Sequence, residues 1–146
     1  MSTLILIPTH NEEESIGEVI SELLSLDLPI LIVASACTDR SPMIAKDFGC
    51  IVIESDIGYE NACLTGYRWA LDNGFDQVVQ MDADGQHPSE YVSVILQQSY
   101  RGDWIIGSRQ GTGTPISMHQ RISSWMFRSV VHSLYDMKLH DPTSGM

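Results

Sequence analysis

Two carboxylates one residue apart, Asp82 and Asp84, directly follow an apolar segment at residues 78–81. If the strand continues through them, residues i and i+2 face the same side, and both carboxylates can approach one ion. Carboxylate oxygens suit Mg²⁺ or Mn²⁺, with phosphates and water completing the coordination, and Gln86 could add a carbonyl oxygen. The alternative is that both residues cap the next helix or form a turn. Their position at a strand end favours the metal site.

Short apolar runs alternate with segments of helical periodicity, as expected for elements that position such a site. We expect strands at residues 4–7, 30–33, 51–53, 77–81 and 103–106, the first stopping at Pro8, and helices at 13–24, 44–48, 61–73 and 88–98. This alternation predicts an α/β fold with a mostly parallel sheet flanked by helices. Ligands of such sheets bind beyond the carboxyl ends of the strands, which selects the loops at 8–12, 34–39, 82–87 and 107–115.

Composition limits the class of protein. The chain has 146 residues, 43% of them hydrophobic, which suits a single domain spanning 1–146. No apolar run approaches the length of a membrane-spanning helix, and no secretory signal is recognisable, so we expect a cytoplasmic protein. The three cysteines include no CxxC pair, so the sequence favours neither a disulfide framework nor a zinc site.

The charge balance is strongly acidic. Nineteen acidic residues against eight basic ones give a formal net charge of −11, which argues against a nucleic-acid partner. A phosphorylated ligand would meet few cationic side chains, and a divalent metal held by carboxylates would solve that problem. Arg109, just beyond a predicted strand, suits phosphate oxygens; a salt bridge is its alternative role. Alternatively, the negative net charge only aids solubility.

Five motifs, taken in order, resemble those of family 2 glycosyltransferases. They are the P-x-x-N-E opening at residues 8–12, a glycine-bounded helix entry at 58–67, the D-x-D segment at 82–87, G-S-R at 107–109 and D-x-T-S-G at 141–145. Together they cover nearly the whole chain. The branch that the chain resembles most is that of the dolichyl- or polyprenyl-phosphate sugar synthases.

The resemblance implies a GT-A fold that binds a nucleoside-diphosphate sugar and transfers the sugar with inversion, here to a polyprenyl-phosphate-like acceptor. Asp82, Asp84 and Gln86 would hold the Mg²⁺ or Mn²⁺, and Asp84 would also count as catalytic. Arg109 would contact acceptor phosphate or diphosphate, and Asp141 would orient the acceptor or act as a base, with capping of its own turn as the alternative. The donor would be bound by Pro8, Thr9, His10, Glu12, Ser35, Asp82 and Ala83.

Two features depart from the family pattern. Where relatives carry an Asp pair after the second strand, this chain has Ala34-Ser35-Ala36-Cys37. In relatives, one of these two carboxylates normally accepts a hydrogen bond from the nucleotide base. The Ser35 hydroxyl can also accept, but it lacks the charge that strengthens such a bond. Asp39 is then expected as a helix N-cap. The chain also ends at Met146, soon after the last motif, so we expect truncation at its C-terminus. Apolar residues within 116–139 could form a dimer contact, a peripheral contact at the inner membrane face, or part of the core.

Three functional hypotheses therefore stand. The first is an active glycosyltransferase. The second is a degenerate, inactive domain that binds nucleotide sugars or a partner, which the Ala34–Cys37 replacement motivates. The third is a nucleotidyltransferase, which lacks support because no glycine-rich phosphate loop follows the first strand. A dehydrogenase is disfavoured because residues 8–12 contain no G-x-G-x-x-G.

Overall fold

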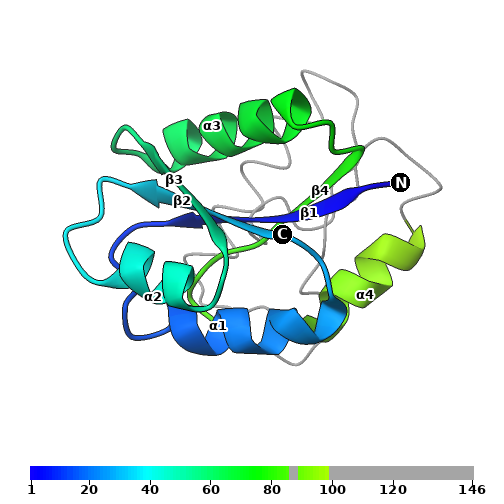
Figure 1. Ribbon diagram of the computed structural model, residues 1–146, viewed down its shortest axis with the longest axis horizontal. Coiled ribbons are helices and arrows are strands. Elements are labelled where there is room, and N and C mark those ends of the chain that lie inside the picture. The colour runs from blue at the N-terminus through cyan, green and yellow to red at the C-terminus, as the bar shows by residue number, and fades with distance from the viewer. Residues whose placement is uncertain (86–88, 99–146) are drawn as a thin grey trace, which may run out of the picture. The chain divides into compact units, whose positions relative to one another are not determined.

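The computed structural model describes residues 1–85 and 89–98, and residues Met1–Gln97 form one compact unit. The strands are β1 (Thr3–Thr9), β2 (Ile30–Ser35), β3 (Ile51–Ser55) and β4 (Gln77–Gln80). The helices are α1 (Ile16–Leu23), which runs into the 3-10 turn η1 (Leu24–Leu26), α2 (Ser41–Asp47), α3 (Tyr59–Asp72) and α4 (Ser89–Gln98) (Figure 1). The strand predicted at 103–106 lies outside the described residues. None of the helices described is long and apolar enough to cross a membrane.

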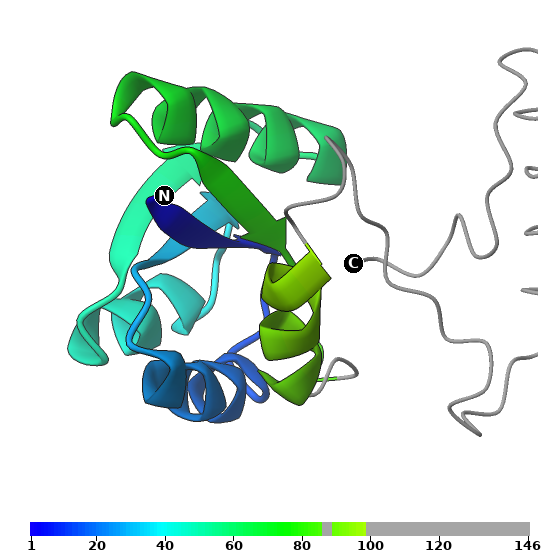
Figure 2. The ribbon, with the colours of Figure 1, turned by 90° about the vertical axis from the view of Figure 1, so that its right-hand side faces the viewer.

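The four strands form one parallel sheet in the order β3-β2-β1-β4. Helix α3 covers one face, and α1, α2 and α4 lie on the other (Figure 2). The predicted parallel sheet with helices on both faces is therefore confirmed. The chain steps outward from β1 to β3 and then returns past β1 to place β4, so the strand order reverses at β1. Such a reversal is where ligands of open α/β sheets commonly bind.

Strand β1 continues through Pro8 to Thr9, so the prediction that it stops at Pro8 is wrong. The Ile5 N–H donates to Pro29 on the β2 side, whereas the Leu6 carbonyl accepts from Met81 on the β4 side. Because these directions alternate along a strand, the nitrogen of Pro8 faces β4. Paired residues of β4 end at Gln80, opposite Leu6. The missing N–H of proline therefore interrupts no ladder.

The two faces of the sheet bury separate apolar layers. Beneath α3, the leucines Leu4, Leu6 and Leu31 pack with Val33 and with the small helical residues Ala62 and Ala70. Helix α1 presents a buried stripe of Ile16, Val19, Ile20 and Leu23, as its periodicity predicts. Leu24, the last residue of the helix predicted at 13–24, is 48% exposed because the helix tightens into η1 at this residue.

Gly66 lets α3 approach the sheet closely. A Cβ at this position would lie 2.3 Å from Leu6 Cδ1 and 3.1 Å from Val33 Cγ2. Both neighbours belong to the buried layer, so neither can move without disturbing the core. Gly17 of α1 differs, since a Cβ there would meet Ile44 and Phe48 side chains at 3.6 and 3.7 Å, ordinary contact distances.

These two glycines give a matched prediction. Gly66→Ala should lower the free energy of unfolding by about 1–3 kcal/mol through overpacking. Gly17→Ala should raise it by roughly 0.5–1 kcal/mol, because alanine is the better helix former and the space exists. Urea denaturation of both variants measures the difference. Equal effects of the two substitutions would contradict the close approach of α3.

Candidate functional site

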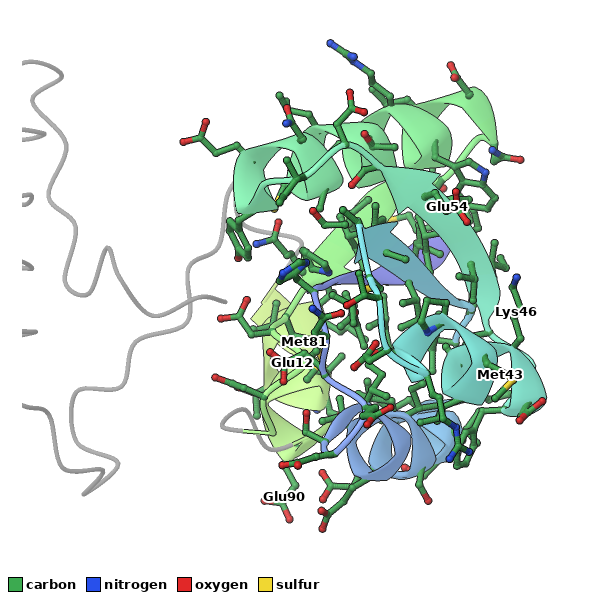
Figure 3. The ribbon with its side chains drawn as sticks, turned by 90° about the vertical axis from the view of Figure 1, so that its left-hand side faces the viewer. Glu12, Met43, Lys46, Glu54, Met81 and Glu90 are labelled. Atoms are coloured by element: carbon green, nitrogen blue, oxygen red, sulfur yellow. The ribbon has the colours of Figure 1, made fainter. Side chains whose placement is uncertain are left out.

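A cavity of about 420 Å³ lies at the carboxyl edge of the sheet, the edge that Figure 3 faces, with Glu12 labelled there. This volume is within the range of small-molecule sites. The cavity is lined by the carboxyl ends of β1 and β2, by the loops after β1, β3 and β4, and by the start of α3. The lining residues are Pro8, Thr9, His10, Glu12, Ser35, Ile57, Gly58, Tyr59, Ala62, Asp82, Ala83 and Asp84.

The structure brings together every predicted site residue that it describes. Eight residues from three separate parts of the chain, at strand ends and in the loops that follow, line the same cavity, namely Pro8, Thr9, His10, Glu12, Ser35, Asp82, Ala83 and Asp84. Gln86, Arg109 and Asp141 lie outside the described residues. Their roles stay predictions.

Sequence reasoning assigned no site residue to the cavity wall that follows β3. Ile57, Gly58, Tyr59 and Ala62 line it; the family-like motif at 58–67 covers the last three, but the loops selected by the carboxyl-end rule do not include 56–58. The rule that picks carboxyl-end loops applies equally to the third strand. A second signal was Gly58 itself, whose φ of 121° immediately before α3 requires glycine.

Strand β4 ends at Gln80, so Asp82 and Asp84 lie beyond it rather than on a continuing strand. The argument that residues i and i+2 of a strand share a face therefore does not apply. Met81 still donates its N–H to Leu6 at 3.1 Å and is 1% exposed, which fixes the point where the loop leaves the sheet. Gly85 follows with a φ of 73°. Both carboxylates nevertheless reach the same cavity.

The donor set fits a hard divalent cation that shares its coordination with a ligand. Among residues 1–85 and 89–98, no three His, Cys, Asp or Glu side chains cluster as a metal site. A structural zinc site needs such a protein cage. Mg²⁺ is commonly held by one or two carboxylates plus phosphates and water, which Asp82 and Asp84 on one cavity wall could provide.

The loops after β1 and β2 are joined by side-chain hydrogen bonds to backbone N–H groups. Asn11 Oδ1 accepts from the Thr38 N–H at 2.8 Å, Asp39 Oδ2 from the Glu13 N–H at 3.0 Å, and Glu13 Oε2 from the Arg40 N–H at 3.0 Å. The Ser41 hydroxyl accepts from the Glu12 N–H at 2.8 Å. The bonds run in both directions, so neither loop can shift alone. The two loops therefore form one unit, in which the loop after β2 holds the cavity wall that contains Glu12.

Asp39 stabilises this unit through its charge. Its carboxylate accepts from the Ser41 N–H at 3.0 Å and from the Ser41 hydroxyl at 2.7 Å. Slight desolvation acts against the effect, but the hydrogen bonds from Ser41 and Glu13 hold the pKa of Asp39 below its ordinary value. The formal N-cap position of α2 falls on Arg40. The Asp39 carboxylate still accepts from the N–H of Ser41, the first residue of the helix, which is close to the N-cap role predicted for Asp39.

Ser35 ties the end of β2 to the loop after β3. Its hydroxyl accepts from the Gly58 N–H at 3.0 Å and donates to the Asp56 carbonyl at 3.1 Å. The residue is 3% exposed, and Ala34 is 2% exposed. A carboxylate at position 35 could accept from the Gly58 N–H but could not donate to the Asp56 carbonyl, so an Asp there would lose one of the contacts that hold loop 56–58. The proton of the Ser35 hydroxyl and one of its lone pairs are thus already used in hydrogen bonds to this loop.

His10 adds a further tie across the same wall. Its Nδ1 lies 2.5 Å from the Ser35 carbonyl oxygen. Because a carbonyl can only accept, Nδ1 must carry the proton, and Nε2 is the acceptor of the neutral ring. This contact fixes the tautomer of a side chain that lines the cavity.

Tyr59 connects the remaining wall. Its hydroxyl lies 3.0 Å from Asp82 Oδ1 and accepts from Gln80 Nε2 at 2.8 Å. Burial of the phenol and the charge of Asp82 both raise the pKa of Tyr59 well above its ordinary value. The hydroxyl therefore remains protonated, and able to donate, throughout the neutral range.

The three cysteines are free thiols, as predicted. Cys37 donates to the Thr9 carbonyl at 3.3 Å beside the cavity, and Cys63 is buried in α3. Burial raises the pKa of all three thiols. Each is therefore held in the unreactive protonated form at neutral pH.

The fold and the acidic cavity together define a class, the GT-A glycosyltransferase-like α/β domains. Among solved structures, glucosyl-3-phosphoglycerate synthase from Mycobacterium tuberculosis in complex with Mn²⁺, uridine diphosphate and glucosyl-3-phosphoglycerate superposes with a TM-score of 0.73. It is 20% identical and covers 99% of this chain and 55% of that one. At this identity the likeness establishes the fold, which is the one the motif resemblance implied.

The family follows from the sequence match. The model of glycosyl transferase family 2 matches residues 4–138, and the chain belongs to that family. Undecaprenyl-phosphate mannosyltransferase of Micrococcus luteus is 29% identical over 99% of this chain and 65% of its own length. Polyprenol monophosphomannose synthase of Mycolicibacterium smegmatis is 29% identical over 98% and 59%. The chain thus spans about three fifths of these relatives. Membership of glycosyl transferase family 2 argues against the nucleotidyltransferase hypothesis.

The first prediction from this geometry concerns Asp39. Asp39→Ala should cost about 1 kcal/mol of unfolding free energy at neutral pH, the usual loss for such a cap. Because the pKa of folded Asp39 lies below the unfolded value, its stabilisation is present above about pH 4 and disappears as pH falls through the folded-state pKa. Chemical denaturation between pH 7 and pH 3 measures this. The control is Glu14→Ala, which removes an exposed carboxylate in the neighbouring loop after β1; a pH-independent difference for Asp39→Ala would contradict the account.

The second prediction concerns Ser35. Ser35→Ala should lower the free energy of unfolding by about 1–3 kcal/mol, because the Gly58 N–H and the Asp56 carbonyl lose their partner. Ser25→Ala, which removes an exposed hydroxyl bonded to the Glu22 carbonyl, should change it by less than about 0.5 kcal/mol. Hydrogen exchange of the Gly58 amide provides a local readout. Unchanged protection there in Ser35→Ala would show that the loop is held by other contacts.

Proposed function

We propose that this chain forms the donor-binding part of an inverting, metal-dependent glycosyltransferase. It would take its sugar from a nucleoside-diphosphate sugar and transfer it to a polyprenyl-phosphate-like acceptor. The observation that carries the proposal is that Asp82 and Asp84 line one cavity together with Thr9, His10 and Glu12. Membership of glycosyl transferase family 2 and the polyprenyl-phosphate relatives support the reaction class.

Electrostatics supports the need for a cation. The described lining of the cavity contains Glu12, Asp82 and Asp84 and no lysine or arginine. At an effective dielectric constant of 20, a phosphate charge 4 Å from one carboxylate is repelled by about 4 kcal/mol. Asp82 and Asp84 would hold Mg²⁺ or Mn²⁺, which would neutralise the diphosphate and stabilise the charge that develops on it as it leaves. The Mn²⁺-bound fold neighbour is consistent with this choice of ion.

The reaction itself is a single displacement. An oxygen of the acceptor phosphate would form a bond to the anomeric carbon while the bond from that carbon to the diphosphate breaks. The leaving nucleotide keeps the electron pair, and the configuration inverts. An anionic acceptor oxygen needs no strong general base. Arg109 would hold phosphate oxygens, and Asp141 would orient the acceptor; both assignments come from the motif resemblance.

The loops that are joined at the cavity wall supply the orientation. The hydrogen bonds across the β1 and β2 loops hold the wall formed by Thr9 to Glu12, and Ser35 holds the β3 loop against it. A donor that binds between walls already in place gives up less conformational entropy on binding. The reacting bond would then be positioned by loops rather than by side chains that must first be ordered.

Calorimetric titration tests the proposal. UDP and GDP are titrated into the chain with Mn²⁺ and again with EDTA, and one of the two should bind in a metal-dependent manner. Asp84→Asn should weaken that binding more than tenfold, or by more than about 1.4 kcal/mol. Asp72→Asn makes the same change at an exposed residue at the other end of α3 and should have no effect.

The two results that oppose the proposal differ in meaning. Binding that is the same with Mn²⁺ and with EDTA would exclude the metal role of Asp82 and Asp84. No binding of either nucleotide by the folded chain would favour a domain that has lost its donor site, with Ala34–Cys37 as the first place to look.

A further inference from the structure

A line of side chains runs from the core to the metal-binding loop. The Tyr67 hydroxyl donates to Gln80 Oε1 at 2.5 Å, Gln80 Nε2 donates to the Tyr59 hydroxyl at 2.8 Å, and the Tyr59 hydroxyl meets Asp82 Oδ1 at 3.0 Å. The four residues come from α3, β4 and the loop that follows β4. We call them the Tyr67–Asp82 line.

The direction of every bond in the line is determined. An ionised carboxylate can only accept, so the single proton of Tyr59 must point to Asp82. The Tyr59 oxygen then accepts from an N–H, which requires the amide nitrogen of Gln80 on that side. The Gln80 carbonyl oxygen faces the other way and accepts the proton of Tyr67. The Tyr59 hydroxyl also interacts with the Cys63 thiol one turn further along α3. Chains of hydrogen bonds such as this line strengthen their members cooperatively.

The far end of the line is firmly anchored. Tyr67 packs against the buried layer under α3, and Gln80 is the last residue of β4, paired with Leu6 of β1. Asp82 lies two residues beyond the strand and directly after Met81, whose N–H is the last to donate to β1 on this side. Tyr59 is 52% exposed and lines the cavity beside Asp82. Its hydroxyl thus connects a loop carboxylate to rigid elements.

We propose that Tyr59 is a positioning residue for the metal site: its hydroxyl holds the Asp82 carboxylate in the orientation in which the cation binds. The inference rests on the proposed function, because it assumes that Asp82 is a ligand. Partners that orient a ligating carboxylate usually contribute a tenfold to hundredfold effect on metal affinity. Tyr59 is half exposed, so the lower end of that range applies.

The test measures Mn²⁺ binding by the full chain in the presence of UDP or GDP. The EPR signal of free Mn²⁺ is the readout. Tyr59→Phe keeps the ring and removes only the hydroxyl, and it should weaken Mn²⁺ binding roughly tenfold. Tyr67→Phe, one step further from Asp82, should have a smaller effect. Thr3→Val is the matched control and should leave Mn²⁺ binding unchanged. The Thr3 hydroxyl donates to Gln77, which lies at the opposite end of β4 from Gln80.

A double-mutant cycle separates positioning from a general structural effect. In an Asp82→Asn background, Tyr59→Phe should cause no further loss of Mn²⁺ affinity, because the oriented carboxylate is already gone. An equal further loss there, or full Mn²⁺ affinity in Tyr59→Phe while Asp82→Asn loses it, would overturn the positioning role and leave the proposed function intact. Absence of Mn²⁺ binding by the unmodified chain would overturn both.

Discussion

Side-chain hydrogen bonds between loops are the interaction on which the cavity depends. A parallel sheet fixes where its strands end but not how the following loops are arranged. Here Asn11, Glu13 and Asp39 join the β1 and β2 loops, and Ser35 joins β2 to the β3 loop. Tyr59 extends the connection to Asp82. The cavity walls are thus one hydrogen-bonded frame resting on the buried strands β1 and β2.

The carboxylates in and beside the cavity have different roles according to their partners. Asp39 is engaged by the helix and loop N–H groups, and its charge is used for stability. Asp82 and Asp84 lie on the cavity wall, where a shared cation would convert their repulsion of phosphate into attraction. Net charge alone could not have distinguished these roles.

The sequence predicted the layers well and the connections poorly. Apolar periodicity located β2, β3, α1 and α3 to within a few residues, since burial on both faces of a parallel sheet leaves a strong pattern. It missed the passage of β1 through Pro8, because that depends on where β4 ends. It also missed Tyr59, whose partners Gln80 and Asp82 are more than 20 residues away. The D-x-D pair was found by its position after a strand, although the strand does not continue through it.

The most direct measurement is paramagnetic broadening by Mn²⁺ of the backbone amide resonances of the chain with UDP or GDP bound. The account predicts broadening of amides in the cavity loops, at 9–12, 57–59 and 82–85. Amides at the opposite edge of the sheet, at 27–28 and 73–76, should remain sharp. Broadening that is uniform, or that centres on another cluster of carboxylates, would contradict the assignment of Asp82 and Asp84 as the metal-binding pair.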